Sequence, residues 1–179
     1  MKPPMDKTPS SIPVASYADL LQTLIEICTL LNGLQIEYRL GGSFVINVHA
    51  GRCVIEAGDL DFVCKTKAMH DRMIDALVTQ LGFIQTKQVQ WEGDAGEENM
   101  NTNLTSPTGV LVEVAWVNDI ILADEASTVL VHDCPISVFS LVDMKATYEE
   151  FRDRKPGAEE KLALIDQLLN KERVDELSK

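Results

Sequence analysis

The sequence predicts an α/β protein of the α+β type, in which helices pack on a mixed β-sheet and a helical tail closes the chain. Three observations support this fold class. Amphipathic helical segments alternate with short apolar strands in the first half, several strand-like segments follow one another in the second half, and two helical segments end the chain. That order is typical of a mixed sheet with helices packed on it.

The first half of the chain begins with a helical segment, "SYADLLQTLIEICTLLNG". Its apolar residues recur at intervals of three and four from Leu20 to Leu31, and Ser16 can cap its start. The segments that follow are, in order, a strand "QIEYRL" broken by two glycines, a short helix "SFVINVHAG", a loop "RCVIEAG", a strand "DLDFVCK" and an amphipathic helix "AMHDRMIDALVTQLG". This half therefore alternates helices with strands.

The second half is richer in strands. We expect "FIQTKQVQWEG" and "NMNTNLTSPTG" to be strands joined by an acidic loop, "VLVEVAWV" to be the most apolar strand after them, and "STVLVHDCPISV" to be another extended piece. Two helices, "SVFSLVDMKATYEEFRDR" and "GAEEKLALIDQLLNKERVDEL", then form the tail. The sequence shows no internal repeat and no low-complexity segment.

Length and composition indicate one globular domain. The chain has 179 residues, of which 45% are hydrophobic, and this is enough to bury a core. Residues 1–14 are expected to form a disordered arm, because their prolines and polar side chains have nothing to bury. Residues 15–134 are predicted to form the core, and residues 135–179 a helical region packed on it.

The charge balance bears on the partners. The formal net charge is -12, and such an acidic surface repels the phosphates of nucleic acids. It attracts a cationic small molecule instead. The composition therefore argues against DNA or RNA as a partner.

The cysteines and the hydropathy pattern bear on the compartment. Four cysteines and three histidines occur without the spacing of a zinc site, and reduced thiols fit a cytoplasmic protein. The N-terminal residues lack an apolar signal core, and no run of about 18 apolar residues is present to span a membrane. We therefore expect a cytoplasmic protein without membrane contact, while the oligomeric state stays open.

Three carboxylates are candidates for chemistry. Asp59 and Asp61 are two apart on a predicted strand, so their side chains point to the same face, roughly 7 Å apart along the chain. Glu113 lies in the otherwise apolar strand "GVLVEVAWV", where a buried charge is costly unless it is paired or bound to metal. Carboxylates on adjacent strands suit Mg2+ and can activate a hydroxyl for attack on phosphorus. The simpler interpretation is a solvated strand end and an edge strand that faces water.

A glycine turn precedes these carboxylates. Gly41 and Gly42 allow a tight turn and a close approach of the backbone to a ligand. A helix that begins at Ser43 directs free N–H groups toward whatever lies above the turn, and a triphosphate fits such a place. Taken alone, Gly-Gly-Ser is more often a plain loop, so the position of the turn just ahead of the aspartates carries the argument.

Together these residues resemble the nucleotidyltransferase superfamily, which has the polymerase-β-like fold. In that superfamily a Gly-Gly or Gly-Ser turn opens a helix, an Asp-x-Asp strand follows, and a third acid lies on a later strand. The stretches "GGSFVINVHAGR" and "GDLDFV" are most similar to the small aminoglycoside and lincosamide nucleotidyltransferases and to the abortive-infection toxin-like ones. The resemblance covers most of the chain from about residue 17 to residue 169 and is weakest at 83–108.

The resemblance implies a set of roles. Asp59, Asp61 and Glu113 would be catalytic and would bind Mg2+. Lys145, on the first tail helix, would face the phosphates of the nucleoside triphosphate. The phosphates would also contact a group of residues earlier in the chain, namely Gly41, Gly42, Ser43 and Arg52.

The sequence departs from the superfamily pattern in two places. After Arg52 the family commonly has further basic residues before the acids, whereas this chain has "CVIEAG", with Glu56 of opposite charge. The third acid is Glu113 instead of the more usual aspartate, and a glutamate side chain is one methylene longer. These departures bear on the phosphate contacts and on the geometry of the base.

The resemblance leads to one principal hypothesis about function. The protein would be a metal-dependent nucleotidyltransferase that moves a nucleoside monophosphate from an NTP, first of all ATP, to a hydroxyl of a small-molecule acceptor. A cation similar to an aminoglycoside is favoured by the charge. Two alternatives stay open: a binding or regulatory domain that kept the fold and lost the chemistry, and a toxin-like enzyme that acts on RNA or protein.

Overall fold

The computed structural model describes residues 15–93, 96–117, 126–154 and 157–177, so the predicted N-terminal arm lies outside the described residues. The described helices are α1 (Tyr17–Gly33), α2 (Phe44–Ala50), α3 (Lys67–Leu81), α4 (Leu141–Glu150) and α5 (Ala158–Leu177). The described strands are β1 (Arg39–Gly41), β2 (Asp59–Cys64), β3 (Ile84–Glu92), β4 (Glu98–Thr105), β5 (Leu111–Trp116), β6 (Ser127–Val131) and β7 (Cys134–Val138).

The strands form one mixed sheet, in the order β3-β4-β5-β2-β1-β7-β6. Strand β2 runs parallel to β5 and antiparallel to β1, while β1 runs parallel to β7. The remaining neighbours, β3–β4, β4–β5 and β6–β7, are antiparallel. A mixed sheet with packed helices confirms the predicted fold class.

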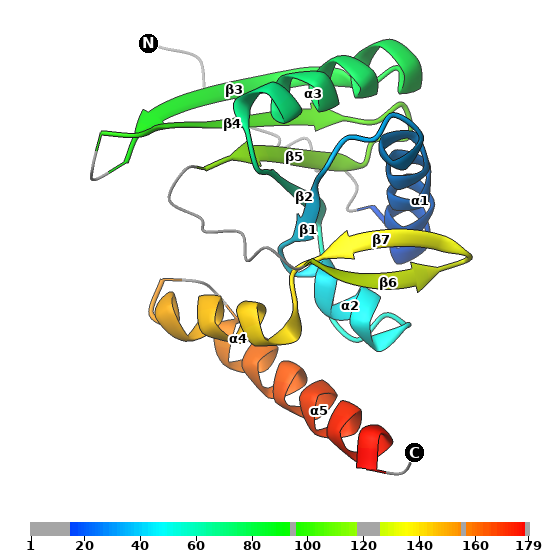
Figure 1. The fold of residues 1–179 in the computed structure, drawn as a ribbon, viewed down its shortest axis with the longest axis vertical. Helices are drawn as coiled ribbons and strands as arrows, with labels where there is room; N and C mark the ends of the chain where they lie inside the picture. The colour runs from blue at the N-terminus through cyan, green and yellow to red at the C-terminus, as the bar shows by residue number, and fades with distance from the viewer. Residues whose placement is uncertain (1–14, 94–95, 118–125, 155–156, 178–179) are drawn as a thin grey trace, which may run out of the picture.

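The helices form two groups (Figure 1). Helices α1 and α3 contact each other and cover β2, with α1 extending over β7 and α3 over β5. Helices α4 and α5 pack together at the opposite end of the view, and α5 also contacts α2. The predicted helical tail is therefore present, and it contacts the core next to the helix that follows the glycine turn.

Helix α1 forms where its sequence predicts it. Ser16 and Asp19 make a capping box, in which the Ser16 hydroxyl accepts a hydrogen bond from the Asp19 N–H at 3.2 Å and the Asp19 carboxylate accepts one from the Ser16 N–H at 3.1 Å. The apolar stripe buries Leu20, Leu24 and Ile27 against the sheet side of the core. Capping of its N-terminus and burial of its apolar stripe therefore both stabilise α1.

Two boundaries differ from the sequence-based expectation. The extended piece "STVLVHDCPISV" is a hairpin, because His132 and Asp133 adopt φ angles of 48° and 63° and so close a two-residue turn between β6 and β7. The following helix begins at Leu141 and not at Ser137. Ser140 caps it by accepting a hydrogen bond from the Asp143 N–H at 3.0 Å, and the residues before it belong to β7.

The predicted division into core and C-terminal region stays a prediction, although β7 at Cys134–Val138 joins the sheet and α4 and α5 follow it. None of the helices in the described part of the chain is both long enough and apolar enough to cross a membrane.

Candidate active site

The glycine turn is built around the Asp61 side chain. Gly41 is the last residue of β1 and pairs with Asp61 on β2. Gly42 follows with φ at +65°, and a β-carbon at that position would overlap the Asp61 carboxylate. Only glycine combines this left-handed backbone with the absence of a side chain. The turn therefore brings the backbone of Gly42 directly against the Asp61 carboxylate.

The three candidate carboxylates share one face of the sheet. Asp59 and Asp61 alternate with buried residues on β2, and both side chains are half-buried. Glu113 is paired directly with Asp61 across the parallel β2–β5 ladder. Because paired residues on neighbouring strands point to the same side, Glu113 joins the aspartates, as its place in the sequence predicted.

Burial and a neighbouring cation both act on the pKa of Asp59. Burial raises the pKa of Asp59 above its ordinary value, and the positive charge of Lys161 opposes that shift. Within the residues that the structure describes, no three side chains among His, Cys, Asp and Glu gather closely enough to enclose a metal ion. The aspartate pair thus offers an incomplete set of oxygen ligands.

The loop between α2 and β2 is anchored by Asn47, which is 1% exposed. Its side-chain oxygen accepts hydrogen bonds from the N–H groups of Val54 and Ile55 at 2.8 and 3.0 Å, and its amide donates to the Ile55 carbonyl at 2.9 Å. A buried amide with all these partners fixes the chain where it turns toward Asp59. The segment "CVIEAG", which departs from the superfamily pattern, is therefore held in place by Asn47.

Helix α4 adds a buried tyrosine to the site. Tyr148 is 3% exposed, and its pKa is raised mainly by burial. The negative charges of Asp61 and Asp59 add to this rise, whereas a hydrogen bond with the Ser43 side chain opposes it. Ser43 occupies the N-cap position of α2, but its side chain makes no capping hydrogen bond there. The hydroxyl of Ser43 instead joins Tyr148 beside the two aspartates.

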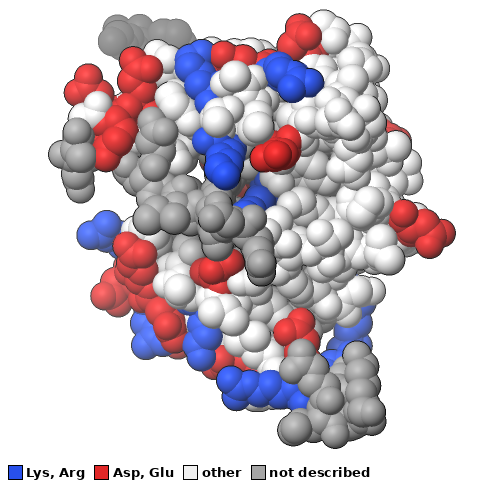
Figure 2. Space-filling model, in the orientation of Figure 1, with Lys and Arg blue, Asp and Glu red and all other residues white. Residues whose placement is uncertain are grey.

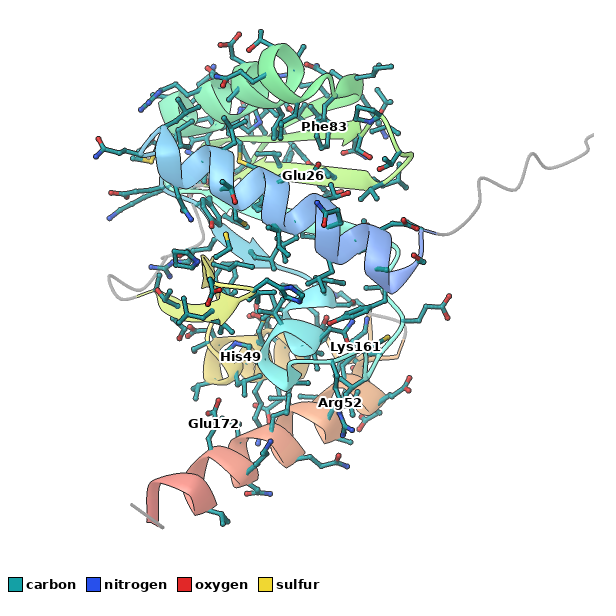
Figure 3. All side chains as sticks on the ribbon, turned by 90° about the vertical axis from the view of Figure 1, so that its right-hand side faces the viewer. Glu26, His49, Arg52, Phe83, Lys161 and Glu172 are labelled. Atoms are coloured by element: carbon teal, nitrogen blue, oxygen red, sulfur yellow. The ribbon has the colours of Figure 1, made fainter. Side chains whose placement is uncertain are left out.

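Helix α5 adds a cation to the same place. The Lys161 ammonium lies 5.2 Å from the centroid of the Tyr148 ring and close enough to Asp59 to influence its pKa. Figure 3 shows Lys161 near the N-terminal end of α5. Lys161 is only half-buried, so its charge can reach a ligand above the carboxylates.

Two cations expected from the resemblance, Lys145 and Arg52, have other neighbours in the structure. The Lys145 ammonium is 2.8 Å from the Asp166 carboxylate on α5 and 3.9 Å from Glu149. Arg52 is exposed just beyond the end of α2, close to α5 (Figure 3), and lines a cavity of about 530 Å³ with residues such as Leu164. A phosphate contact of either residue stays a prediction.

A second cavity, of about 520 Å³, lies along β1 and β2 on the side of Arg39, Val63 and Lys65. It contains none of the three candidate carboxylates. Arg39 is buried and its guanidinium lies 5.9 Å from the ring centroid of Phe139. Arg39 is two residues before Gly41 on β1, so these two positions share one face of the strand.

Comparisons with solved structures address the fold. The antibiotic-resistance factor ANT(2'')-Ia, in complex with adenylyl-2''-tobramycin, superposes with a TM-score of 0.60 at 20% identity, covering 88% of this chain and 93% of its own. The lincosamide antibiotic adenylyltransferase LnuA, with lincomycin bound, gives 0.61 at 15% identity over 82% and 96%. A nucleotidyltransferase-like protein from Paracoccidioides brasiliensis gives 0.59 at 15% identity over 87% and 77%.

The chain has the nucleotidyltransferase fold. At these identities the likeness concerns the arrangement of the backbone. No protein-family model matches the sequence, and no match was found among curated proteins.

Within this nucleotidyltransferase fold, sequence reasoning missed three residues of the site: Asn47, Tyr148 and Lys161. The sequence does contain an indication for Asn47, because it is a polar residue inside the apolar stretch "SFVINVHAG". The sequence contains no such indication for Tyr148 and Lys161, because they lie on two helices whose orientation is set by tertiary packing. Their proximity to Asp59 is visible only in the folded chain.

The surface charge of the nucleotidyltransferase fold is mixed in the view of Figure 2. Acidic and basic side chains are interspersed there, and among the described residues of that face they form no continuous basic stripe.

Proposed function

We propose that the protein is a metal-dependent nucleotidyltransferase that transfers a nucleoside monophosphate from an NTP, first of all ATP, to a hydroxyl of a small-molecule acceptor. One observation carries the proposal: Gly42 lies directly against the Asp61 carboxylate, on the face that also bears Asp59 and Glu113. This arrangement supports a role of the turn in phosphate binding and of the carboxylates in metal binding.

The donor set fits Mg2+. That ion is commonly held by one or two carboxylates and completes its octahedral shell with water and substrate phosphates, so two aspartates suffice on the protein side. Asp59 and Asp61 would hold it, and Glu113 would act as the base. When bound, Mg2+ would neutralise charge on the phosphates of the nucleotide.

The reaction proposed is an in-line displacement. The acceptor oxygen attacks the α-phosphorus of the NTP, a new P–O bond forms, and the bond from that phosphorus to the pyrophosphate oxygen breaks. Glu113 accepts the proton of the acceptor hydroxyl, and pyrophosphate leaves. Glu113 suits this role because it is half-buried beside Asp61 and faces the same side of the sheet.

The triphosphate would be bound from both sides. The backbone of Gly41 and Gly42 and the Ser43 hydroxyl would contact it from the turn. We propose Lys161 as the cation on the opposite side, since its ammonium lies beside Tyr148 and affects Asp59. Lys145 and Arg52, the cations expected from the resemblance, are further candidates.

The choice of a small-molecule acceptor is supported by the fold neighbours, because ANT(2'')-Ia and LnuA were solved with an adenylylated antibiotic and an antibiotic. The mixed surface charge and the net charge of -12 favour it over RNA. We further propose the cytoplasm as the compartment, since the four cysteines are free.

The test uses ATP labelled at the α-phosphate, Mg2+ and a pool of small metabolites below 1 kDa. Labelled adducts and pyrophosphate are separated by chromatography. Wild-type protein is expected to produce a labelled adduct together with pyrophosphate. Asp61→Asn is expected to abolish both, because the substituted amide is a poor metal ligand.

Asp75→Asn is the matched control, since Asp75 is exposed on α3. It should transfer label like wild type. Equal turnover of Asp61→Asn and wild type would overturn the catalytic assignment. A folded wild-type protein that binds Mg2+-ATP but makes no adduct would instead favour the binding-domain alternative.

A further inference from the structure

The face of the sheet that carries the three carboxylates continues over β5, β4 and β3. Asn103 on β4 is paired with Glu113, which is itself paired with Asp61, so the three side chains are in line across the sheet. The opposite face of β4 points to α3, as the hydrogen bond between Thr102 and His70 at 3.1 Å demonstrates. Asn101 and Asn103, on either side of Thr102, therefore point away from α3.

This face is lined by amides where strands rarely have them. Asn99, Asn101 and Asn103 occupy alternate positions of β4, although asparagine is depleted in β-strands. Asn99 and Asn101 precede the residue that meets Glu113, so the amides form a row that leads to the carboxylates. Such a row has a cost in strand propensity, which a contact with a ligand can offset.

One of these amides has an unsatisfied acceptor. Asn101 Oδ1 is buried and lacks a hydrogen-bond partner within the described part of the chain. A buried carbonyl oxygen without a donor costs about 1–3 kcal/mol, and a hydroxyl donor from a ligand would recover that cost.

The same face presents apolar side chains to solvent. Val89 pairs with Asn101, Trp91 with Asn99, and Leu111 with Thr105. The three apolar residues are 40%, 41% and 42% exposed, respectively. They offer flat apolar surface on which the CH groups of a sugar or another saturated ring can pack.

The charges beside the amides are balanced. Among the described residues on this face of β3, β4 and β5, only Lys87 and Glu113 are charged, and Lys87 pairs with Asn103. An amide offers both donors and an acceptor, which match a hydroxyl group. An ammonium group only donates, so it can pair with the Asn101 oxygen but not with the amide N–H groups of Asn101 and Asn103.

The spacing suits one small molecule. With strands about 4.8 Å apart and about 3.4 Å per residue, the Cα atoms of Asn103 and Asn101 lie about 10 and 12 Å from that of Asp61. A molecule of two linked rings reaches from the carboxylates to either amide. Its far end can then rest on Val89 and Trp91.

We propose that the acceptor is an uncharged, polyhydroxylated molecule with at least one saturated ring, such as a glycoside, held on this face by Asn101 and Asn103 with one hydroxyl beside Glu113. This inference rests on the proposed function, and it replaces the expectation of a cationic acceptor. The acceptor would contact the side chains of this face, namely the amides, Lys87 and Glu113, so their local charge matters more than the net charge of the whole chain.

The test compares matched neutral and cationic sugars. The probes are trehalose against trehalosamine and N,N'-diacetylchitobiose against chitobiose, each added to the full-length protein with Mg2+ and a non-hydrolysable ATP analogue. Binding is measured by saturation-transfer NMR on the sugar signals. The neutral member of each pair is expected to bind about 5-fold more tightly or better, because a hydroxyl or acetamide pairs with the amides.

Charge-changing variants sharpen the test. Asn101→Asp combined with Asn103→Asp should reverse the order within each pair, and Asn101→Leu should weaken the neutral sugars about 10-fold. Asn170→Asp is the control, since Asn170 is exposed on α5, and it should leave the order unchanged.

Three results would overturn the proposal: tighter binding of the cationic members to wild type, an affinity unaffected by the changes at Asn101 and Asn103, or no binding of any probe. The outcome is separable from that of the proposed function, since binding is measured without turnover. Asp61→Asn should still bind the neutral sugars. Sugar binding by wild type without any nucleotidyl transfer would reject the enzyme and leave the sugar site standing.

Discussion

The two sides of the candidate site are assembled differently. One side, residues 39–64, is a single local unit of strand, glycine turn, helix, loop and strand, in which Gly42 lies against Asp61 and Asn47 fixes the loop. The other side consists of Tyr148 and Lys161, which reach the site only because α4 and α5 pack together and α5 packs on α2. The first is fixed by backbone geometry, and the second by the docking of two helices.

This difference predicts different responses to substitution. A change in the local unit has little room for adjustment, since its neighbours are backbone and a half-buried carboxylate. A change in the helical side removes one interaction while the helices stay docked. Damage to the local unit should therefore abolish activity, and damage to the helical side should reduce it in steps.

The largest effect is expected for Gly42→Ala. The new methyl group would overlap the Asp61 carboxylate, and the φ of +65° disfavours any side chain. Displacement of Asp61 by about 1 Å should lower nucleotidyl transfer at least about 100-fold. Turnover and thermal unfolding are measured on the same preparation.

Gly51→Ala is the matched control for that variant. Gly51 has the same φ of +65°, but a β-carbon there meets no atom within 4 Å. Its unfolding free energy should fall by about 1 kcal/mol from backbone strain, with turnover preserved. If Gly51→Ala lost as much activity as Gly42→Ala, strain in the backbone and not the contact with Asp61 would explain the loss.

The next largest effect is expected for the lysine that binds the phosphates of ATP. Lys161→Gln should raise the KM for ATP about 10- to 100-fold, the effect of losing one charge-assisted contact. Lys145→Gln should change it less than about 3-fold, because the Lys145 ammonium is already paired with Asp166 at 2.8 Å. Steady-state kinetics with ATP as the varied substrate separates the two lysines.

The reverse ranking of these two lysines would return the phosphate contact to Lys145, as the resemblance to the superfamily implied. It would also mean that Lys145 leaves Asp166 when the nucleotide binds. Asp166→Asn would then lower the KM for ATP, which gives an independent measurement of the same point.

A smaller effect is expected for Tyr148→Phe. Loss of the hydroxyl frees the Ser43 side chain to rotate, and kcat should fall about 3- to 10-fold while the KM for ATP changes little. Tyr38→Phe is the control, because Tyr38 is also buried, at 6% exposure, and lines the cavity that contains none of the three carboxylates. Equal kcat losses in the two variants would indicate a general loss of packing.

The smallest effect is a gain in thermal stability, expected for Asp59→Asn. Burial raises the pKa of Asp59, so the folded state holds the proton more tightly than the unfolded state, and stability falls as the pH rises through this range. Asp59→Asn removes the unfavourable charge, so its Tm without metal should exceed that of wild type by about 2 °C at pH 7. Solvent around the half-buried carboxylate limits the gain.

The pH dependence identifies the cause of that gain. The difference in Tm should shrink as the pH is lowered and Asp59 becomes protonated in both states of the wild type. A gain that stays constant down to acidic pH would point to a change in packing instead of charge.

The comparison also explains what the sequence could predict. Alternation and turn residues identified β2 and the glycine turn, and the isolated charge in an apolar strand identified Glu113, because these signals lie within a few residues of each other. The parallel pairing of β2 with β5 then confirmed that Glu113 joins Asp61. This local part of the candidate site could therefore be predicted from the sequence.

The helical side of the site could not be predicted from the sequence in the same way. An amphipathic helix indicates which face is apolar, but not which neighbour that face meets, so Lys161 could not be distinguished from other lysines of the tail. The start of α4 was wrong by a few residues because β7 extends into the predicted helix. Docking of distant elements supplies the missing information.

The most direct test of nucleotide binding at this site is the thermal stability of wild type and Asp61→Asn with ATP, measured with and without Mg2+. At a concentration 100-fold above the Kd, ATP should stabilise wild type by about 2.7 kcal/mol, which corresponds to about 5 °C or more, and should do so only with Mg2+. Asp61→Asn should lose that Mg2+-dependent part. A wild-type protein that no NTP stabilises, or an equal shift in both proteins, would contradict the account.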